Sequence, residues 1–468
     1  MTTIARSLTD LKVEKSMTGQ QHVQFGDELP VDFNWNAQAH PLVPIPRLLP
    51  GEPTPQQAAQ VELVSECLRD GLHGVEVYPS VDAMLHYIEK LYAFGVTRVT
   101  VGIYSGDNNR VDTTIRQLLA RLRDEMPAII PIVLCLATPA SLQWAANCKN
   151  IHPRLEPLVF MGTAPSRRLV QGWQLDFVLK QLAGAVAEAV RLGMTVIGAS
   201  EHSTQTPPDD FREIIRVQIE EGASTFVIAD TIGIARPRGA YRITAFTRRT
   251  LDELGAKHVR LEWHGHQDTG NAIANAMLAI AAGANRIHVV ARGIGERAGN
   301  VPLEGIALNI NSILEEAGRP CPWKMSTIFD VLKCYEEMAE VPAPAFGMLA
   351  RRYNHTTLGI HADALLKAHM LASKAAEFGR YELAHQLRDM ARRIYSAVDP
   401  ESIGDQMSVG VSPWSGQNTV KLAYLLCGGD PNSLHAEEIN RILNAAKERG
   451  RELDLSELRQ MFWPKLAA

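Results

Sequence analysis

Residues 259–293 read VRLEWHGHQDTGNAIANAMLAIAAGANRIHVVARG, and this stretch decides the fold class. Its first and last segments, 259–266 and 285–293, are short, largely apolar and rich in β-branched residues, as buried strands are. The middle segment, 271–285, has the spacing of an amphipathic helix, and Gly283 stands where a left-handed C-terminal cap is needed. Apolar strands joined by helices are typical of a parallel sheet that is covered on both faces.

The same unit recurs along the chain from residue 61 onward. Helical stretches such as residues 80–95 alternate with further apolar runs, and Gly95, Gly193 and Gly222 again stand at helix ends. Eight strands with their helices in about 250 residues fit a (β/α)8 barrel better than an open doubly wound sheet, which is the alternative. The six additional runs begin at Val61, Val96, Ile129, Pro157, Met194 and Thr225.

The strand–helix pattern is absent on both sides of residues 61–320. Residues 1–60 lack periodicity and are rich in Pro, Gln and Asn, which predicts an irregular N-terminal arm. After residue 320 the strand-like runs stop. We therefore predict an α/β fold, with a catalytic (β/α)8 TIM barrel over residues 61–320 and a C-terminal, mainly helical subdomain over residues 321–468. The helical stretches of that subdomain are 325–339, 362–397 and 433–450.

The composition is that of an ordinary globular protein. Of 468 residues, 46% are hydrophobic and 21% are charged, which excludes a disordered, fibrous or disulfide-dense secreted chain. The 47 Lys and Arg against 52 Asp and Glu give a net charge of −5, so we expect no nucleic-acid partner. Six scattered cysteines without a CxxC pair indicate reduced thiols. Because the sequence has no signal segment and no long apolar stretch, we expect a cytoplasmic protein with no membrane partner.

In a (β/α)8 barrel the reactive groups lie where the strands end, because the loops there form the mouth. His264 and His266 are two apart on one strand, so they face the same way. Asp70, at another strand end, completes a His₂–carboxylate set that suits Mg²⁺, Mn²⁺, Fe²⁺ or Zn²⁺. The alternative is one histidine in the core and one that faces solvent. The polar residues at the predicted strand ends include Arg69, Asp70, Thr163, Glu201, Thr231, His264 and His266.

Two further features lie beside this set. Arg69 could stabilise negative charge as it develops on a carbonyl oxygen, whereas the alternative is a structural arginine paired with Glu201. The segment GIGERAGN (293–300) follows the eighth strand, and its glycine spacing is not that of a dinucleotide-binding fingerprint. We therefore expect a tight glycine loop, from whose end Asn300 could reach the metal.

Three of these segments together resemble one enzyme family. LRDGLHG (68–74), LEWHGHQD (261–268) and GIGERAGN are similar to motifs of the alkylmalate synthases. These are metal-dependent condensing enzymes and include isopropylmalate, homocitrate, citramalate and Re-type citrate synthases. Beyond the barrel, three segments look like the helical subdomain of the synthases: LGIHADALLK (358–367), IYSAVDPESIG (394–404) and SGQNTVKL (415–422).

The resemblance implies a metal centre and a set of catalytic groups. The implied metal ligands are Asp70, His264, His266 and Asn300. The implied catalytic residues are Arg69, which stabilises the polarised carbonyl, Glu201, and the pair His361 and Tyr395. That pair comes from the helical subdomain, usually that of the neighbouring subunit, so the resemblance also implies a homodimer with shared active sites. Without the family motifs, this pair would be ordinary packing residues.

The substrate-contacting positions depart from the family pattern. The implied contacts are Arg69, His73, Thr163, Arg167 and Thr231. His73 replaces the usual glutamine, TAPSRR (163–168) stands where many relatives have TS-x-x-H, and Gln267 replaces Asn or Asp. Arg167 and Arg168 would add cations near the far end of the substrate; the alternative is a pair of solvated loop charges.

The implied reaction is a Claisen-type condensation by an acyltransferase. Acetyl-CoA and a 2-oxo acid would give an alkylmalate- or citrate-type product and CoA, with a divalent metal (Mg, Mn, Zn or Fe) as cofactor and His361 as the favoured base. The extra arginines favour an acceptor with a second anionic group, such as oxaloacetate, 2-oxoglutarate or phosphonopyruvate. A lyase or aldolase of the same superfamily and a non-catalytic barrel are the alternatives. Few residues follow Tyr424, so we expect no leucine-type regulatory domain.

Overall fold

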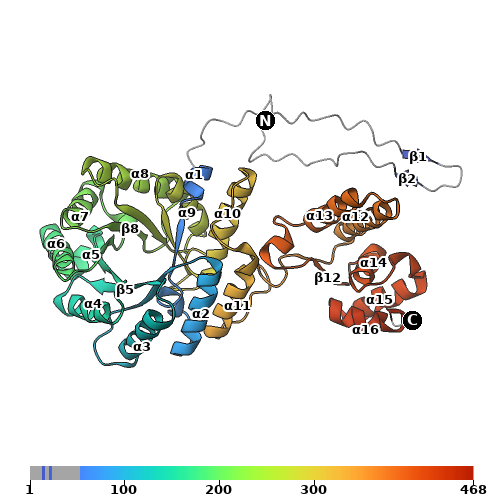
Figure 1. Ribbon diagram of the computed structural model, residues 1–468, viewed down its shortest axis with the longest axis horizontal. Helices are drawn as coiled ribbons and strands as arrows, with labels where there is room; N and C mark the ends of the chain where they lie inside the picture. The colour runs from blue at the N-terminus through green and yellow to red at the C-terminus, as the bar shows by residue number, and fades with distance from the viewer. Residues whose placement is uncertain (1–12, 16–20, 24–52, 467–468) are drawn as a thin grey trace. The chain divides into compact units, whose positions relative to one another are not determined.

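A computed structural model describes residues 13–15, 21–23 and 53–466 of the chain (Figure 1). Residues 1–49 and 50–468 form two separate units. In the first unit, β1 (Val13–Lys15) pairs antiparallel with β2 (Gln21–Val23). Most of the predicted N-terminal arm lies outside the described residues.

Eight parallel strands of the second unit close into a barrel. Each strand pairs with the next along the chain, and the last pairs with the first, so the predicted (β/α)8 fold is confirmed and the open sheet is excluded. All eight strands fall on the apolar runs of the sequence. They are β3 (Glu62–Ser65), β4 (Arg98–Ile103), β5 (Ile130–Leu136), β6 (Glu156–Phe160), β7 (Ile197–Ser200), β8 (Thr225–Asp230), β9 (Arg260–Gly265) and β10 (Arg286–Val289).

Helices surround the barrel and follow the strands in turn (Figure 1). The Ser80 hydroxyl accepts a hydrogen bond from the Ala83 N–H at the start of the first barrel helix, and Gly95 ends that helix with a φ of 119°. The barrel helices are α2 (Val81–Phe94), α3 (Arg110–Glu125), α4 (Pro139–Ile151), α6 (Leu175–Arg191), α7 (Pro208–Glu220), α8 (Pro237–Glu253), α9 (Ala272–Ala281) and α10 (Leu303–Glu316), with the short α1 (Pro55–Ala58) and α5 (Pro165–Gln171).

The inside of the barrel has two unlike halves. Alternate residues of a strand face the interior, and on β5 to β8 most of these are apolar and form a cluster with Val64 of β3; the exceptions are Glu156, which pairs with Arg98, and Thr225, which contacts Arg286. On β9, β10, β3 and β4 most of the interior positions are charged or polar instead. The residues at these positions are Glu262, His264, Arg286, His288, Glu62, Arg98 and Thr100.

Helix α11 (Ile328–Met338) follows the barrel and packs against α2. Its buried face, which includes Tyr335, belongs to the same hydrophobic core as the barrel helices. The Tyr335 hydroxyl donates a 2.8 Å hydrogen bond to the carbonyl of Gly71, in the loop that follows β3. Helix α11 therefore braces the loop that carries Arg69 and Asp70.

The remaining residues build a second, separate hydrophobic core. The predicted helical stretch 362–397 is two helices, because Gly379 adopts a φ of 72° between them. The expectation that strands stop after residue 320 needs one correction: β11 (His355–Thr356) pairs with β12 (Ser408–Val409), since two segments far apart in sequence meet there. The helices are α12 (Gly359–Glu377), α13 (Tyr381–Arg393), α14 (Gln417–Leu426), α15 (Ala436–Arg449) and α16 (Leu455–Leu466).

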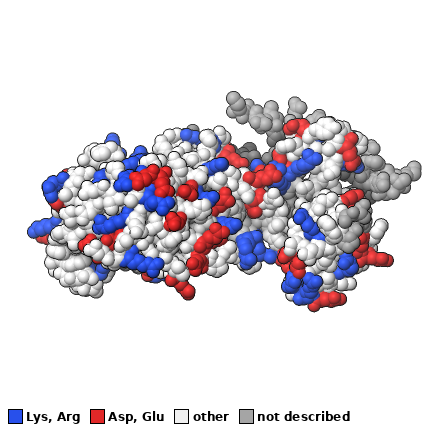
Figure 2. Space-filling model, turned by 60° about the horizontal axis from the view of Figure 1, so that its bottom comes forward, with Lys and Arg blue, Asp and Glu red and all other residues white. Residues whose placement is uncertain are grey.

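Several expectations from composition concern the surface and the thiols. On the face shown in Figure 2, basic and acidic side chains lie intermixed, with no broad area of one sign. All six cysteines fall within the described residues and are free thiols, as predicted. Among the described helices, none has both the length and the apolar character needed to cross a bilayer.

Replacing Tyr335 with Phe tests the brace formed by α11. The Gly71 carbonyl would lose its buried donor, so the free energy of unfolding should fall by about 1–3 kcal/mol. The measurement is the denaturant midpoint followed by circular dichroism. Tyr381→Phe is the matched control, because Tyr381 is 74% exposed and its loss of a hydroxyl should change stability by less than about 0.5 kcal/mol. Equal shifts in the two variants would contradict the brace.

Candidate functional site

Three buried side chains converge at the mouth of the barrel. His264 lies near the end of β9, His266 follows that strand, and Asp70 begins the turn after β3. The Nε2 atoms of the two histidines are 3.2 Å apart and lie 3.5 and 3.7 Å from Asp70 Oδ2. The structure thus brings together the three residues that the sequence predicted as a ligand set.

The environment gives each of these groups the protonation state of a metal ligand. Burial alone would raise the pKa of Asp70, but the neighbouring guanidinium of Arg69 outweighs it and holds that pKa below its ordinary value. Burial lowers the pKa of His264 well below the ordinary value, and it also lowers the pKa of His266. A carboxylate and two neutral imidazoles are the forms that bind divalent cations.

The loop of residues 293–300 fixes the orientation of His266. The Nδ1 atom of this ring lies 3.2 Å from the carbonyl of Gly299, which can only accept a hydrogen bond, so the proton is assigned to Nδ1. The lone pair of Nε2 then points toward Asp70 and His264, as a metal ligand requires. Asn300, itself buried, pairs with His266 through a backbone bridge, so it lies beside the cluster.

The backbone conformation of this loop requires glycine. Gly299 has a φ of 98°, and a side chain there would collide with the carbonyl of Gly293. This agrees with the tight glycine loop predicted from the sequence.

Arg69 does not pair with Glu201, which was the structural alternative in the sequence analysis. Its Nε and Nη1 atoms donate to Glu66 Oε2 at 2.8 Å and to Asp70 Oδ2 at 3.0 Å, and no ion pair with Glu201 exists among the described residues. Glu66 is a site residue that the sequence reasoning missed. Its only signal in the sequence is that a charged residue interrupts the apolar run 61–68, directly after β3.

A histidine lies behind Glu66. His288 Nδ1 is 2.9 Å from Glu66 Oε1, and its Nε2 is 2.8 Å from Glu262 Oε2. Burial would lower the pKa of His288, but the two carboxylates outweigh it and raise that pKa to about 9. Burial would raise the pKa of Glu66, yet Arg69 and His288 lower it to about 2. Both partners of Arg69 are therefore anionic.

The predicted substrate contacts from β6 are held by local bonds. The hydroxyl of Thr163 is buried 2.7 Å from the hydroxyls of Ser200 and Thr206 and donates to the carbonyl of Glu201. Arg168 donates to the Thr163 carbonyl and pairs with Asp210, so it braces the loop rather than facing solvent.

Arg167 has a different setting from that of its neighbour Arg168. Its Nε lies 3.8 Å from Glu201 Oε2, and its guanidinium lies 5.8 Å from the ring centre of Trp173. It is partly exposed and faces the β7 strand end.

Thr231 and His73 lie on two other loops of the mouth. The Thr231 hydroxyl accepts a 2.8 Å hydrogen bond from the His202 N–H, and its carbonyl accepts one from Arg297. His73 Nδ1 lies 3.5 Å from both Asp70 Oδ1 and Glu296 Oε2, and the His73 ring is exposed. His73 therefore borders the His₂–carboxylate cluster from the solvent side.

The structure brings His361 and Tyr395 together as a pair. Their rings stack with centres 4.0 Å apart and planes 25° apart, and 40% of Tyr395 is exposed. Across the described part of the chain, no hydrogen bond, ion pair or ring contact joins either side chain to the cluster of Asp70, His264 and His266.

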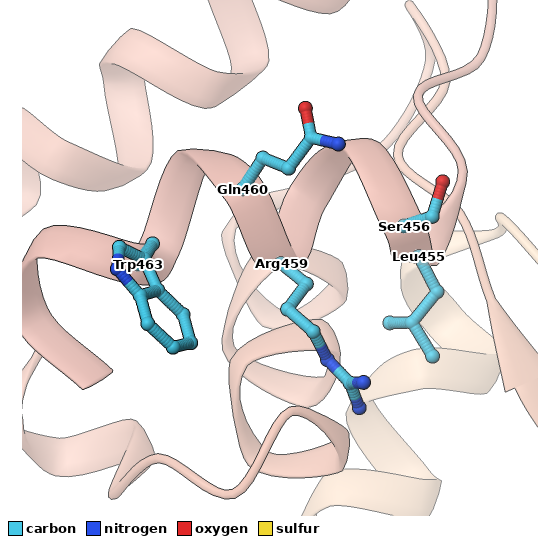
Figure 3. A pocket seen from close by; sticks show the side chains of 5 residues that line it. All are labelled: Leu455, Ser456, Arg459, Gln460 and Trp463. Atoms are coloured by element: carbon cyan, nitrogen blue, oxygen red, sulfur yellow. The ribbon is translucent and has the colours of Figure 1, made fainter. Parts of the chain in front are cut away.

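A separate hollow of about 670 Å³ lies along α16 (Figure 3). Leu455, Arg459 and Trp463 project from one side of the helix, as their spacing of four requires. The lining residues include neither a carboxylate nor an imidazole, so this hollow offers no acid–base group and no metal ligand of those kinds. The lining is completed by Ser456 and Gln460.

Known proteins with a similar sequence share the barrel region. Residues 60–333, more than half of the chain, match the HMGL-like family. The chain is 24% identical over 372 residues to the 2-isopropylmalate synthase of Nitratidesulfovibrio vulgaris, covering 78% of this chain and 66% of that protein. It is 25% identical over 260 residues to the enzyme of the same name from Sediminispirochaeta smaragdinae, covering 54% of this chain and 49% of that protein. The chain thus spans about half to two thirds of these two relatives.

A solved structure shares the fold. The hydroxymethylglutaryl-CoA lyase of Pseudomonas aeruginosa superposes with a TM-score of 0.51 at 16% identity, covering 65% of this chain and 97% of that one. At this identity the likeness shows the fold alone. Because the family match covers residues 60–333, the chain belongs to the HMGL-like family, and its relatives by sequence include the 2-isopropylmalate synthases that its motifs resemble.

Proposed function

We propose that this protein catalyses a Claisen condensation of acetyl-CoA with a 2-oxo acid, releasing CoA and an alkylmalate- or citrate-type product. The observation that carries the proposal is the convergence of Asp70, His264 and His266 beside Arg69 at the barrel mouth. The synthases among its relatives support a condensation rather than a cleavage.

The donor set fits a divalent cation. Asp70, His264 and His266 would hold it, and Asn300 would be a further ligand. One carboxylate and two imidazoles suit Mg²⁺, Mn²⁺, Fe²⁺ or Zn²⁺, and the buried ligands have the required protonation states. When bound, such a cation supplies Lewis-acid polarisation of the acceptor's carbonyl.

Arg69 stabilises the charge that forms on the acceptor. As the carbonyl of the 2-oxo acid becomes an alkoxide, its oxygen gains negative charge, and a fixed guanidinium nearby favours that change. Thr163, Thr231 and His73 lie on the loops around this position and orient the acceptor. Arg167, beside Glu201, favours an acceptor with a second anionic group, such as oxaloacetate, 2-oxoglutarate or phosphonopyruvate.

The carbon nucleophile comes from the methyl group of acetyl-CoA. His361 accepts a proton from that methyl, with Tyr395 stacked on its ring and Glu201 at the mouth assisting. The resulting enolate carbon bonds to the acceptor carbonyl carbon, and the alkoxide takes a proton. Water then cleaves the thioester, which gives the free carboxylate and the CoA thiol.

We propose that the active protein is a cytoplasmic homodimer. The partly exposed stack of His361 and Tyr395 has no contact with the metal-binding cluster in the described part of one chain, so in this proposal a partner copy receives it. The exposed apolar side chain of Ile360, next to His361, supports a covered surface in the assembly.

A panel of acceptors tests the proposed reaction. We expect CoA-thiol release from acetyl-CoA only when a 2-oxo acid and a divalent metal are both present, and faster with dianionic acceptors than with 2-oxoisovalerate. The assay measures free thiol across about a dozen 2-oxo acids and several metals. Cleavage of a hydroxyacyl-CoA, with no release on the panel, would instead establish the lyase alternative, and 2-oxoisovalerate as the best acceptor would overturn the proposed acceptor class.

Replacing His264 with Ala tests the metal ligands. We expect the bound metal to fall below about one tenth of the wild-type content and turnover to be lost, because one of the buried protein ligands is gone. Elemental analysis after dialysis measures the metal. His86→Ala is the matched control, since His86 is exposed on α2 and contacts only Glu89 among the described residues. Wild-type metal content in His264→Ala would refute the assignment.

A further inference from the structure

We infer that His288 is a positioning residue: held between Glu66 and Glu262, it fixes the Glu66 carboxylate and, through it, the guanidinium of Arg69. This inference rests on the proposed function, because it concerns the residue that stabilises charge on the acceptor. His288 itself is inside the barrel wall and is 3% exposed.

Glu66 is the point at which these contacts meet. Its Oε2 accepts a hydrogen bond from Arg69 Nε at 2.8 Å. The same oxygen lies 2.7 Å from Arg69 Nη2. Its Oε1 accepts one from the Thr100 hydroxyl at 2.7 Å and lies 2.9 Å from His288 Nδ1. The plane of this one carboxylate therefore sets where the Arg69 guanidinium lies.

His288 is anchored on its other side. Its Nε2 lies 2.8 Å from Glu262, which Arg286 contacts at 3.0 Å. A row of alternating charges thus runs from the barrel mouth into the barrel, across β3, β10 and β9. Buried charges persist only when paired, and here each member has an oppositely charged neighbour. The row is Arg69, Glu66, His288, Glu262 and Arg286.

A second metal ion is the competing interpretation of the same place. Glu66, His264 and His288 each offer a ligand atom within 4.8 Å of the others. Coordination would need a free lone pair on His288. Its Nε2 is hydrogen-bonded to Glu262 at 2.8 Å, and its Nδ1 lies 2.9 Å from Glu66 Oε1 as an ion pair outside hydrogen-bond geometry. A carboxylate on each side favours the protonated ring, which has no lone pair to offer, and one metal ion per chain.

The test is a double-mutant cycle between His288 and Arg69. In His288→Gln we expect kcat to fall about 10- to 100-fold, as for other residues that orient an active-site group. The metal content should remain one ion per chain, and KM should change less than kcat. In the Arg69→Met background, the same substitution should change kcat less than about twofold, because the residue it positions is absent.

A control variant accompanies the test, and different outcomes would overturn the inference and the proposed function. His258→Gln, at an exposed site, should leave kcat unchanged. Equal losses with and without Arg69, two metal ions per wild-type chain, or wild-type kcat in His288→Gln would each overturn the inference. A wild-type protein that releases no CoA on any acceptor would instead refute the proposed function.

A second variant, Glu262→Gln, provides the test if the His288→Gln protein does not fold. Glu262→Gln keeps His288 in place but removes the charge of its inner partner, so kcat should fall about three- to tenfold, again only while Arg69 is present. A loss of the same size in the Arg69→Met background would overturn the positioning role.

Discussion

The Asp70 carboxylate is buried beside two imidazoles, and it stays charged because the guanidinium of Arg69 lies against it. The rest of the site follows from this requirement. The two strand ends that supply Arg69, Asp70 and the two histidines, those of β3 and β9, must meet within a few ångströms, which closure of the barrel through β10 between them achieves. The loop of Gly299 turns the ring of His266, and α11 holds the Gly71 backbone in place. The barrel thus acts as a rigid frame for one buried carboxylate.

Much of this arrangement was predictable because its signals are local. Each strand is a short apolar run, and the two-residue spacing of His264 and His266 puts both rings on one face without knowledge of the partner strand. The ends of strands in a closed barrel share one mouth, so Asp70 could be added to the pair. These inferences needed only the period of a strand and the topology of the fold.

What the sequence could not supply depends on register and on distant packing. The pairing of β10 with β3 places His288 opposite Val64, and Glu66, two positions further along and on the same face, lies within reach of it. A single sequence contains no information on that register, so Arg69 had Glu201 as an equally good partner. The Tyr335 bond to Gly71 joins residues more than 200 positions apart and left no local trace. The pair His361 and Tyr395 was identified from the family motifs alone, since neither residue stands out chemically by itself.

The two unlike halves of the barrel interior have a consequence for how this enzyme can diverge. On the apolar side, a change of one residue alters volume, and a neighbour can adjust to it. On the charged side, a change at any member of the row from Arg69 to Arg286 leaves an uncompensated charge in a dry interior, a cost of several kcal/mol. Substitutions there must arrive in compensating pairs. In a set of homologous sequences, the row should therefore appear as coupled columns, while the apolar half drifts one position at a time.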